Sequence, residues 1–153
     1  MTTQIRSIGD LVAVKRAAAN TAVTAGGSGD NTEVAGVIID RAAIGFPQSC
    51  VVAIPFTATL AAAATLTIAF DVDEGNDSAL SDAEVVTSAT AAVVATGPSG
   101  GGTVAGTFEA NVSLAGAGRY VRLNFTPNLS AANTDTAALS AVIVFGGMDR
   151  LPQ

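Results

Sequence analysis

The stretch DVDEGND, residues 71–77, concentrates carboxylate side chains in a chain that is otherwise poor in charge. Clustered carboxylates can bind calcium, and an EF-hand loop needs oxygen ligands at positions 1, 3 and 5, glycine at 6 and glutamate at 12. A loop that starts at Asp71 puts Gly75 at position 5 and Asp82 at position 12. A loop that starts at Asp73 puts Gly75 at position 3. Neither register fits, so the sequence predicts no tightly bound metal.

Two weaker uses of this stretch stay open. Asp73, Asp77 and Asp82 could form a looser calcium site at the surface. Paired carboxylates also suit glycoside hydrolysis, but the chain has no Trp and one Tyr to line a sugar cleft. The simplest interpretation is a solvated strand end, with Asp71 and Asp73 outward, followed by a turn. SDAE, residues 81–84, would then be one helical turn with a capping box.

Catalytic chemistry has few side chains available. The chain has no histidine, which removes the commonest general base and metal ligand. Cys50, the single cysteine, lies in the apolar run CVVAIPF and is expected to be a buried small hydrophobe. The net charge of −6 disfavours nucleic-acid binding. We therefore expect neither an enzyme nor a bound cofactor.

Membrane insertion is also not expected. Residues 42–70 carry no charge, but Pro47 and Pro55 interrupt them and no basic flank follows. The N-terminus MTTQIRSIGDLVAVKRAAA has no apolar core of a signal peptide.

The elements that position these residues follow from an apolar pattern with a period of two, which is typical of half-buried antiparallel strands. It occurs in CVVAIPFTA, TLTIAFDV, VAGTFEANVSL and RYVRLNFT, and most of these strands carry one phenylalanine. Glycine-rich turns separate them, and GPSGGG at 97–102 is expected to be a hairpin loop. The pattern predicts an all-β antiparallel β-sandwich, jelly-roll-like or Ig-like, with about seven to nine strands.

Residues 34–153 are expected to form this sandwich. Residues 1–33 have few large apolar side chains. They are expected to be either an N-terminal arm, which crosses to an adjacent subunit or lies on the surface of a partner, or the first strand of the same sandwich.

Several residues are candidates for contacts between proteins. Arg119 and Arg122 alternate outward around Tyr120, where they could pair within the chain, with Glu109 on a neighbouring strand, or grip a partner. LSAVIVFGG is apolar on both faces, so its outward valines need a cover, which could be the N-terminal segment or another subunit. The candidate interface residues are Lys15, Arg16, Arg119, Tyr120, Arg122, Val142 and Val144.

The acidic strand end, the glycine-rich link and LAGAGRYVRLNFTPNLSAANTDTAALSAVIVFGGMDRLP together resemble small virion proteins of tailed bacteriophages, some of which are capsid decoration (cement) proteins. The resemblance covers roughly residues 34–152 and implies a structural protein on the capsid exterior. Its implied partners are the major capsid protein and its own copies, as a homotrimer. No catalytic or binding residue carries over. A phage tail or fibre subunit is the first alternative, and a calcium- or glycan-binding β-sandwich module is the second.

Overall fold

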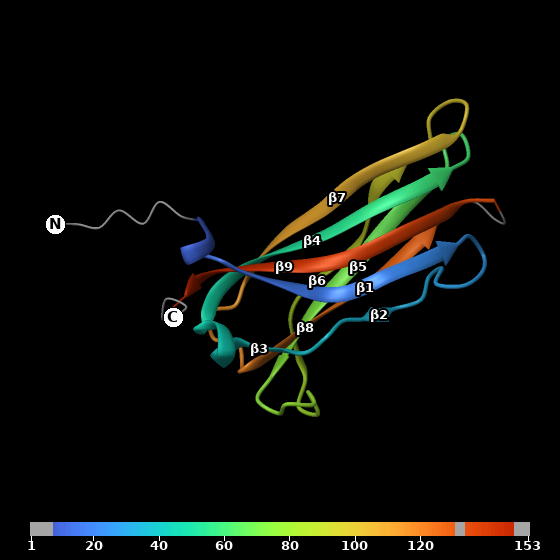
Figure 1. The fold of residues 1–153 in the computed structure, drawn as a ribbon. Helices are drawn as coiled ribbons and strands as arrows, with labels where there is room; N and C mark the ends of the chain where they lie inside the picture. The colour runs from blue at the N-terminus through green and yellow to red at the C-terminus, as the bar shows by residue number, and fades with distance from the viewer. Residues whose placement is uncertain (1–7, 131–133, 149–153) are drawn as a thin grey trace.

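The computed structural model describes residues 8–130 and 134–148. Two antiparallel sheets pack face to face (Figure 1). The four-stranded sheet has the order β1-β9-β4-β7, and the five-stranded sheet has the order β2-β8-β5-β6, with β3 also paired to β8. The predicted all-β antiparallel sandwich is confirmed.

The four-stranded sheet consists of β1 (Ala13–Thr24), β9 (Thr136–Met148), β4 (Pro47–Leu60) and β7 (Gly102–Ser113). The five-stranded sheet consists of β2 (Val34–Ala35), β3 (Ile39–Asp40), β8 (Tyr120–Leu129), β5 (Thr65–Gly75) and β6 (Glu84–Thr96). Two short 3-10 helices, η1 (Ile8–Asp10) and η2 (Arg41–Ile44), lie at the end of the sandwich where β1 begins (Figure 1, left).

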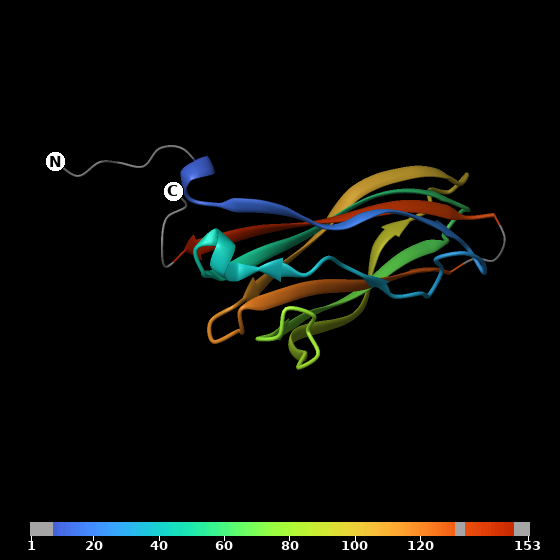
Figure 2. The ribbon, with the colours of Figure 1, turned by 60° about the horizontal axis from the view of Figure 1, so that its bottom comes forward.

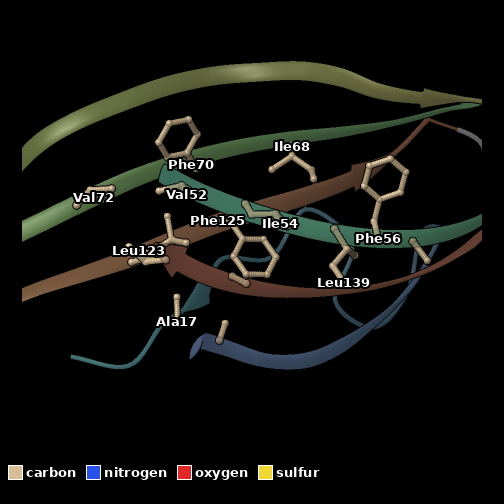
Figure 3. Close-up of a cluster of buried hydrophobic side chains, with 14 of the residues drawn as sticks. Ala17, Val52, Ile54, Phe56, Ile68, Phe70, Val72, Leu123, Phe125 and Leu139 are labelled. Atoms are coloured by element: carbon tan, nitrogen blue, oxygen red, sulfur yellow. The ribbon is translucent and has the colours of Figure 1, made fainter. Parts of the chain in front are cut away.

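The core lies between the sheets and is built from the inward positions of each strand (Figure 3). Phe56, Phe70, Phe125 and Phe145 are buried there. Phe108 is half-buried, and its ring centroid lies 5.6 Å from that of Phe70. The expected arrangement of one phenylalanine on each of these strands is therefore observed, and it fills the space between two sheets.

The connections between strands differ from expectation. Residues 97–101 join β6 in one sheet to β7 in the other, so the expected hairpin loop is a crossover between sheets. The chain crosses again between β7 and β8. Alternation shows which face of a strand is buried, but it carries no information about which sheet the strand joins.

Residues 13–24 form β1, which pairs with β9 at the edge of the four-stranded sheet. The segment that follows β2 closes the gap between the sheets at this side (Figure 2). The Gly36 N–H donates to Leu123 O at 2.9 Å, and the Val37 N–H donates to Ala17 O at 2.7 Å. This segment therefore bonds β8 in one sheet and β1 in the other.

Arg41 holds the end of the sandwich near η2. It is 2% exposed, and its guanidinium donates to four backbone carbonyls. Nη2 bonds Pro47 O at 2.6 Å and Leu114 O at 3.0 Å, while Nη1 bonds Gly118 O at 2.7 Å and also Ala117 O. One side chain therefore ties η2 to the start of β4 and to the β7–β8 loop.

The uncharged stretch 42–70 forms most of η2, all of β4 and the first half of β5. Among the described residues no helix is long and apolar enough to cross a membrane.

Cys50 is buried on β4, as expected, and burial raises the pKa of its thiol from 9.0 to about 11. The folded state therefore disfavours the thiolate, and this contribution to stability is lost as pH rises from 9 towards 11. We expect Ellman's reagent at pH 8 to leave the native thiol unmodified over minutes and to modify one thiol per chain in urea. Rapid stoichiometric modification of the native protein would contradict this.

Candidate assembly surface

The outer face of the four-stranded sheet, the side turned away from the core, is built from small and apolar side chains. On the central strands β4 and β9 the outward residues alternate with buried ones. None of these outward side chains is charged, and none is larger than valine or proline. They are Ser49, Val51, Ala53, Pro55, Thr57 and Thr59 on β4, and Thr136, Ala138, Ser140, Val142, Val144 and Gly146 on β9.

Two charged side chains border this outer face, one on each edge strand. Ala53 pairs with Val142 on one side and with Glu109 on the other, and Val142 pairs with Arg16. Arg16 and Glu109 therefore lie at the two ends of one rung across the sheet. In the described part of the chain neither side chain forms an ion pair.

Shallow hollows mark the outer face. One of about 450 Å³ is lined by Val12, Val51, Asn111 and Val144, among others. Another of about 450 Å³ is lined by residues that include Arg16 and Val142. β1 lies beside β9 in the sheet and not over its outward valines, so β1 does not cover this face.

The predicted interface residues separate into two groups. Arg16, Val142 and Val144 lie on the outer face, where Val14 pairs with Val144. Lys15 is exposed on β1 but pairs with the buried Ile143, so it lies on the opposite face of the strand. Arg119, Tyr120 and Arg122 lie in the other sheet or just before it. The sequence analysis missed Val14, Val51 and Glu109. The pattern CVVAIP, which is apolar on both faces of its strand, is a signal that could have indicated Val51.

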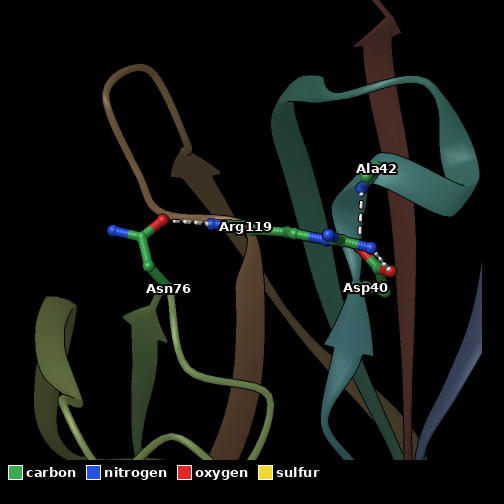
Figure 4. Close-up of polar contacts among 4 residues, drawn as sticks. All are labelled: Asp40, Ala42, Asn76 and Arg119. Carbon is green, nitrogen blue, oxygen red and sulfur yellow. Dashed lines mark hydrogen bonds and ion pairs between the residues drawn. The ribbon is translucent and has the colours of Figure 1, made fainter.

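The arginines of the second group pair within the chain, but not with Glu109, which lies in the opposite sheet. The Arg119 guanidinium forms two bonds to Asp40, at 2.8 and 3.0 Å (Figure 4). It also lies 5.2 Å from the Tyr120 ring centroid. The bond from Arg119 lowers the pKa of Asp40. Arg122 Nη2 donates to Asp73 Oδ2 at 2.8 Å.

Two carboxylates of the acidic stretch, Asp71 and Asp73, belong to a polar network between the neighbouring strands β5 and β8. Asp73 is 8% exposed, so its expected position in a solvated strand end is wrong. Asn124 Nδ2 donates to Asp73 Oδ2 and Asp71 Oδ2, both at 2.8 Å. Asp71 and Asp73 lie on one face of β5, and β8 places Asn124 opposite Asp71 and Arg122 opposite Asp73. The bonds from Asn124 and Arg122 therefore offset the repulsion between the two carboxylates.

The expected helical turn at 81–84 is also absent, because Ser81 and Asp82 lie in a turn and Glu84 begins β6. Asp82 instead closes the loop after β5 by accepting from the N–H groups of Asn76 at 2.8 Å and Asp77 at 3.1 Å. These bonds lower the pKa of Asp82. Among the described residues no three His, Cys, Asp or Glu side chains converge as metal ligands.

Exposed apolar side chains gather at the end of the sandwich where β1 begins. Ile8 in η1 is 75% exposed, and Phe46, just after η2, is 40% exposed. Leu11, Val37 and Ile38 are exposed in the neighbouring segments. η1, η2 and β3 all lie toward this end of the sandwich (Figure 1). We call this group the apolar end.

No family model and no curated protein matches the chain. Solved structures that match the chain include structures of infectious bursal disease virus. The Gx strain structure has a TM-score of 0.47 at 14% identity, and the Gt strain structure has 0.44 at 14%; each match covers 92% of this chain and 34% of the other. T=1 particles derived from the virus give 0.44 at 13% identity, over 90% and 31%. The chain thus spans about a third of these neighbours, and a likeness of this size carries no information about function.

Proposed function

We propose that this chain is a structural virion protein that decorates and stabilises the exterior of a bacteriophage capsid. The observation that carries the proposal is the outer face, where β4 and β9 present Val, Ala and Pro interspersed with Ser, Thr and Gly and no charged side chain, in a chain of net charge −6. Depletion of charged residues is typical of the centre of a contact between proteins. The resemblance of the GRYVR and FGGMDRLP segments to phage virion proteins supports a capsid as the setting.

Two surfaces then have separate partners. The outer face binds other copies of this chain, as a homotrimer, and the apolar end binds the major capsid protein. The acidic stretch gives no support to a catalytic function, because its carboxylates Asp71 and Asp73 already accept hydrogen bonds from Asn124 and Arg122.

Attachment to capsids tests this function. We expect Ile8→Asp with Phe46→Asp to weaken cosedimentation with phage heads that lack the protein by about tenfold or more, because apolar anchors carry much of the energy of an interface. Val93→Asp is the matched control, since Val93 is 60% exposed on β6, away from the apolar end.

Antibody labelling of intact particles distinguishes the alternatives. Label over the head surface supports the proposal. Label confined to the tail or fibres, or equal binding of the double variant and wild type, would contradict it.

A further inference from the structure

The outer face has the shape and charge pattern of a surface that packs on further copies of itself around an axis. All four strands of this sheet are antiparallel, and its two edges, β1 and β7, carry opposite charges at the same level. A rotation axis parallel to the strands would keep equivalent rungs of all copies at the same height along the axis. In such an assembly β7 of one copy lies beside β1 of the next.

The strand register decides which residues meet at that junction. Glu109 and Arg16 end the rung that passes through Ala53 and Val142, so Glu109 would face Arg16 of the next copy. Asn111 and Val14 end the neighbouring rung on the same face, through Val51 and Val144. The junction therefore pairs the two charges of the outer face, both of which form no ion pair in the single chain among the described residues.

The width of the sheet selects the number of copies. Four strands about 4.8 Å apart make a side about 19 Å wide. Three such sheets arranged as a triangle lie about 5.5 Å from the central axis. This distance is close to half the roughly 10 Å that separates packed sheets. Four sides would place each backbone about 10 Å away and leave an open channel. Valine, alanine, serine and threonine on β4 and β9 have the size that fills the three-sided space.

We propose that three copies of this chain pack as a triangular prism with their outer faces toward the axis, and that Glu109 of each copy pairs with Arg16 of the next at the corners. This inference rests on the proposed self-association and specifies its surface and register. It needs no capsid for its test.

Charge reversal tests the corner pair. Wild type is expected to sediment as a trimer, and Glu109→Lys and Arg16→Glu are each expected to raise the dissociation constant by about tenfold or more, because like charges then meet at each corner. The double variant restores the pair in reverse and is expected to recover the trimer. Lys15→Glu is the matched control on the same strand and is expected to assemble normally. Circular dichroism checks that every variant is folded.

A second measurement tests the register directly. In one copy Val14 and Asn111 lie on opposite edges of a four-stranded sheet, too far apart for a disulfide. The prism brings them together between copies. Val14→Cys with Asn111→Cys is therefore expected to give covalent dimers and trimers, with no larger species, on a non-reducing gel.

Several results would overturn the prism. They are a monomeric wild type at tens of micromolar, single reversals that assemble like wild type, a double variant that does not recover, and a disulfide ladder that continues beyond three copies. A monomer that still attaches to phage heads would overturn the prism and leave the capsid function standing. A trimer that meets every expectation but does not attach to phage heads would overturn the capsid function and leave the prism standing.

Discussion

Replacement of Arg41 by methionine is expected to lower the free energy of unfolding by roughly 3–5 kcal/mol, because it removes a buried cation to which several acceptors are bonded. Methionine has a similar length and fills most of the space, so the loss comes from hydrogen bonding and not from a cavity. The carbonyls of Pro47, Leu114, Ala117 and Gly118 would each lose a charged donor. A folded domain is stable by only about 5–15 kcal/mol, so the variant is expected to be marginal.

Urea denaturation followed by circular dichroism measures this loss as a shift of the midpoint. The urea midpoint of Arg41→Lys is expected to lie between those of wild type and Arg41→Met, because an ammonium cannot bond four carbonyls in the plane of a guanidinium. Lys15→Met is the control, since Lys15 is exposed and makes no ion pair within the described residues. The role assigned to Arg41 is wrong if Arg41→Met and Lys15→Met have the same midpoint.

A methyl group at Gly36 is expected to cost roughly 2–4 kcal/mol of stability, because the segment that bonds the two sheets must move away. A Cβ there would lie 2.2 Å from Leu123 O and 2.8 Å from Ala17 O. Both atoms are backbone, in different sheets, so neither can rotate away. The displacement would break the bonds from the Gly36 and Val37 N–H groups to those same carbonyls.

Gly100→Ala is the matched control for Gly36→Ala, because a Cβ at Gly100 meets no atom within 4 Å. Thermal unfolding of both variants decides the question. Hydrogen exchange should also show faster exchange of the Val37 amide in Gly36→Ala. Equal melting temperatures for the two variants would show that the close approach at Gly36 contributes nothing.

The sequence by itself determined the strands and their buried faces. The period-two pattern in TLTIAFDV places Leu66, Ile68, Phe70 and Val72 on one side, and the structure buries all four. A strand with one apolar face has only one orientation that removes this face from water, so local pattern is sufficient. The burial of Cys50 follows from the same reasoning.

Only the tertiary structure decided which strands are neighbours, and with them the partners of the charged residues. The sequence leaves Glu109, on a neighbouring strand, as one possible partner of Arg122, but the crossover puts β7 and β8 in different sheets, and Arg122 pairs with Asp73. Asp40 and Arg119, 79 residues apart, also meet through the fold.

The rung that joins Arg16 to Glu109 depends on three strand registers at once. Each register is set by the packing of whole strands against the common core, and no local pattern around either residue contains it. The same holds for Arg41, whose neighbours in the sequence give no sign of the four carbonyls that converge on it from distant loops.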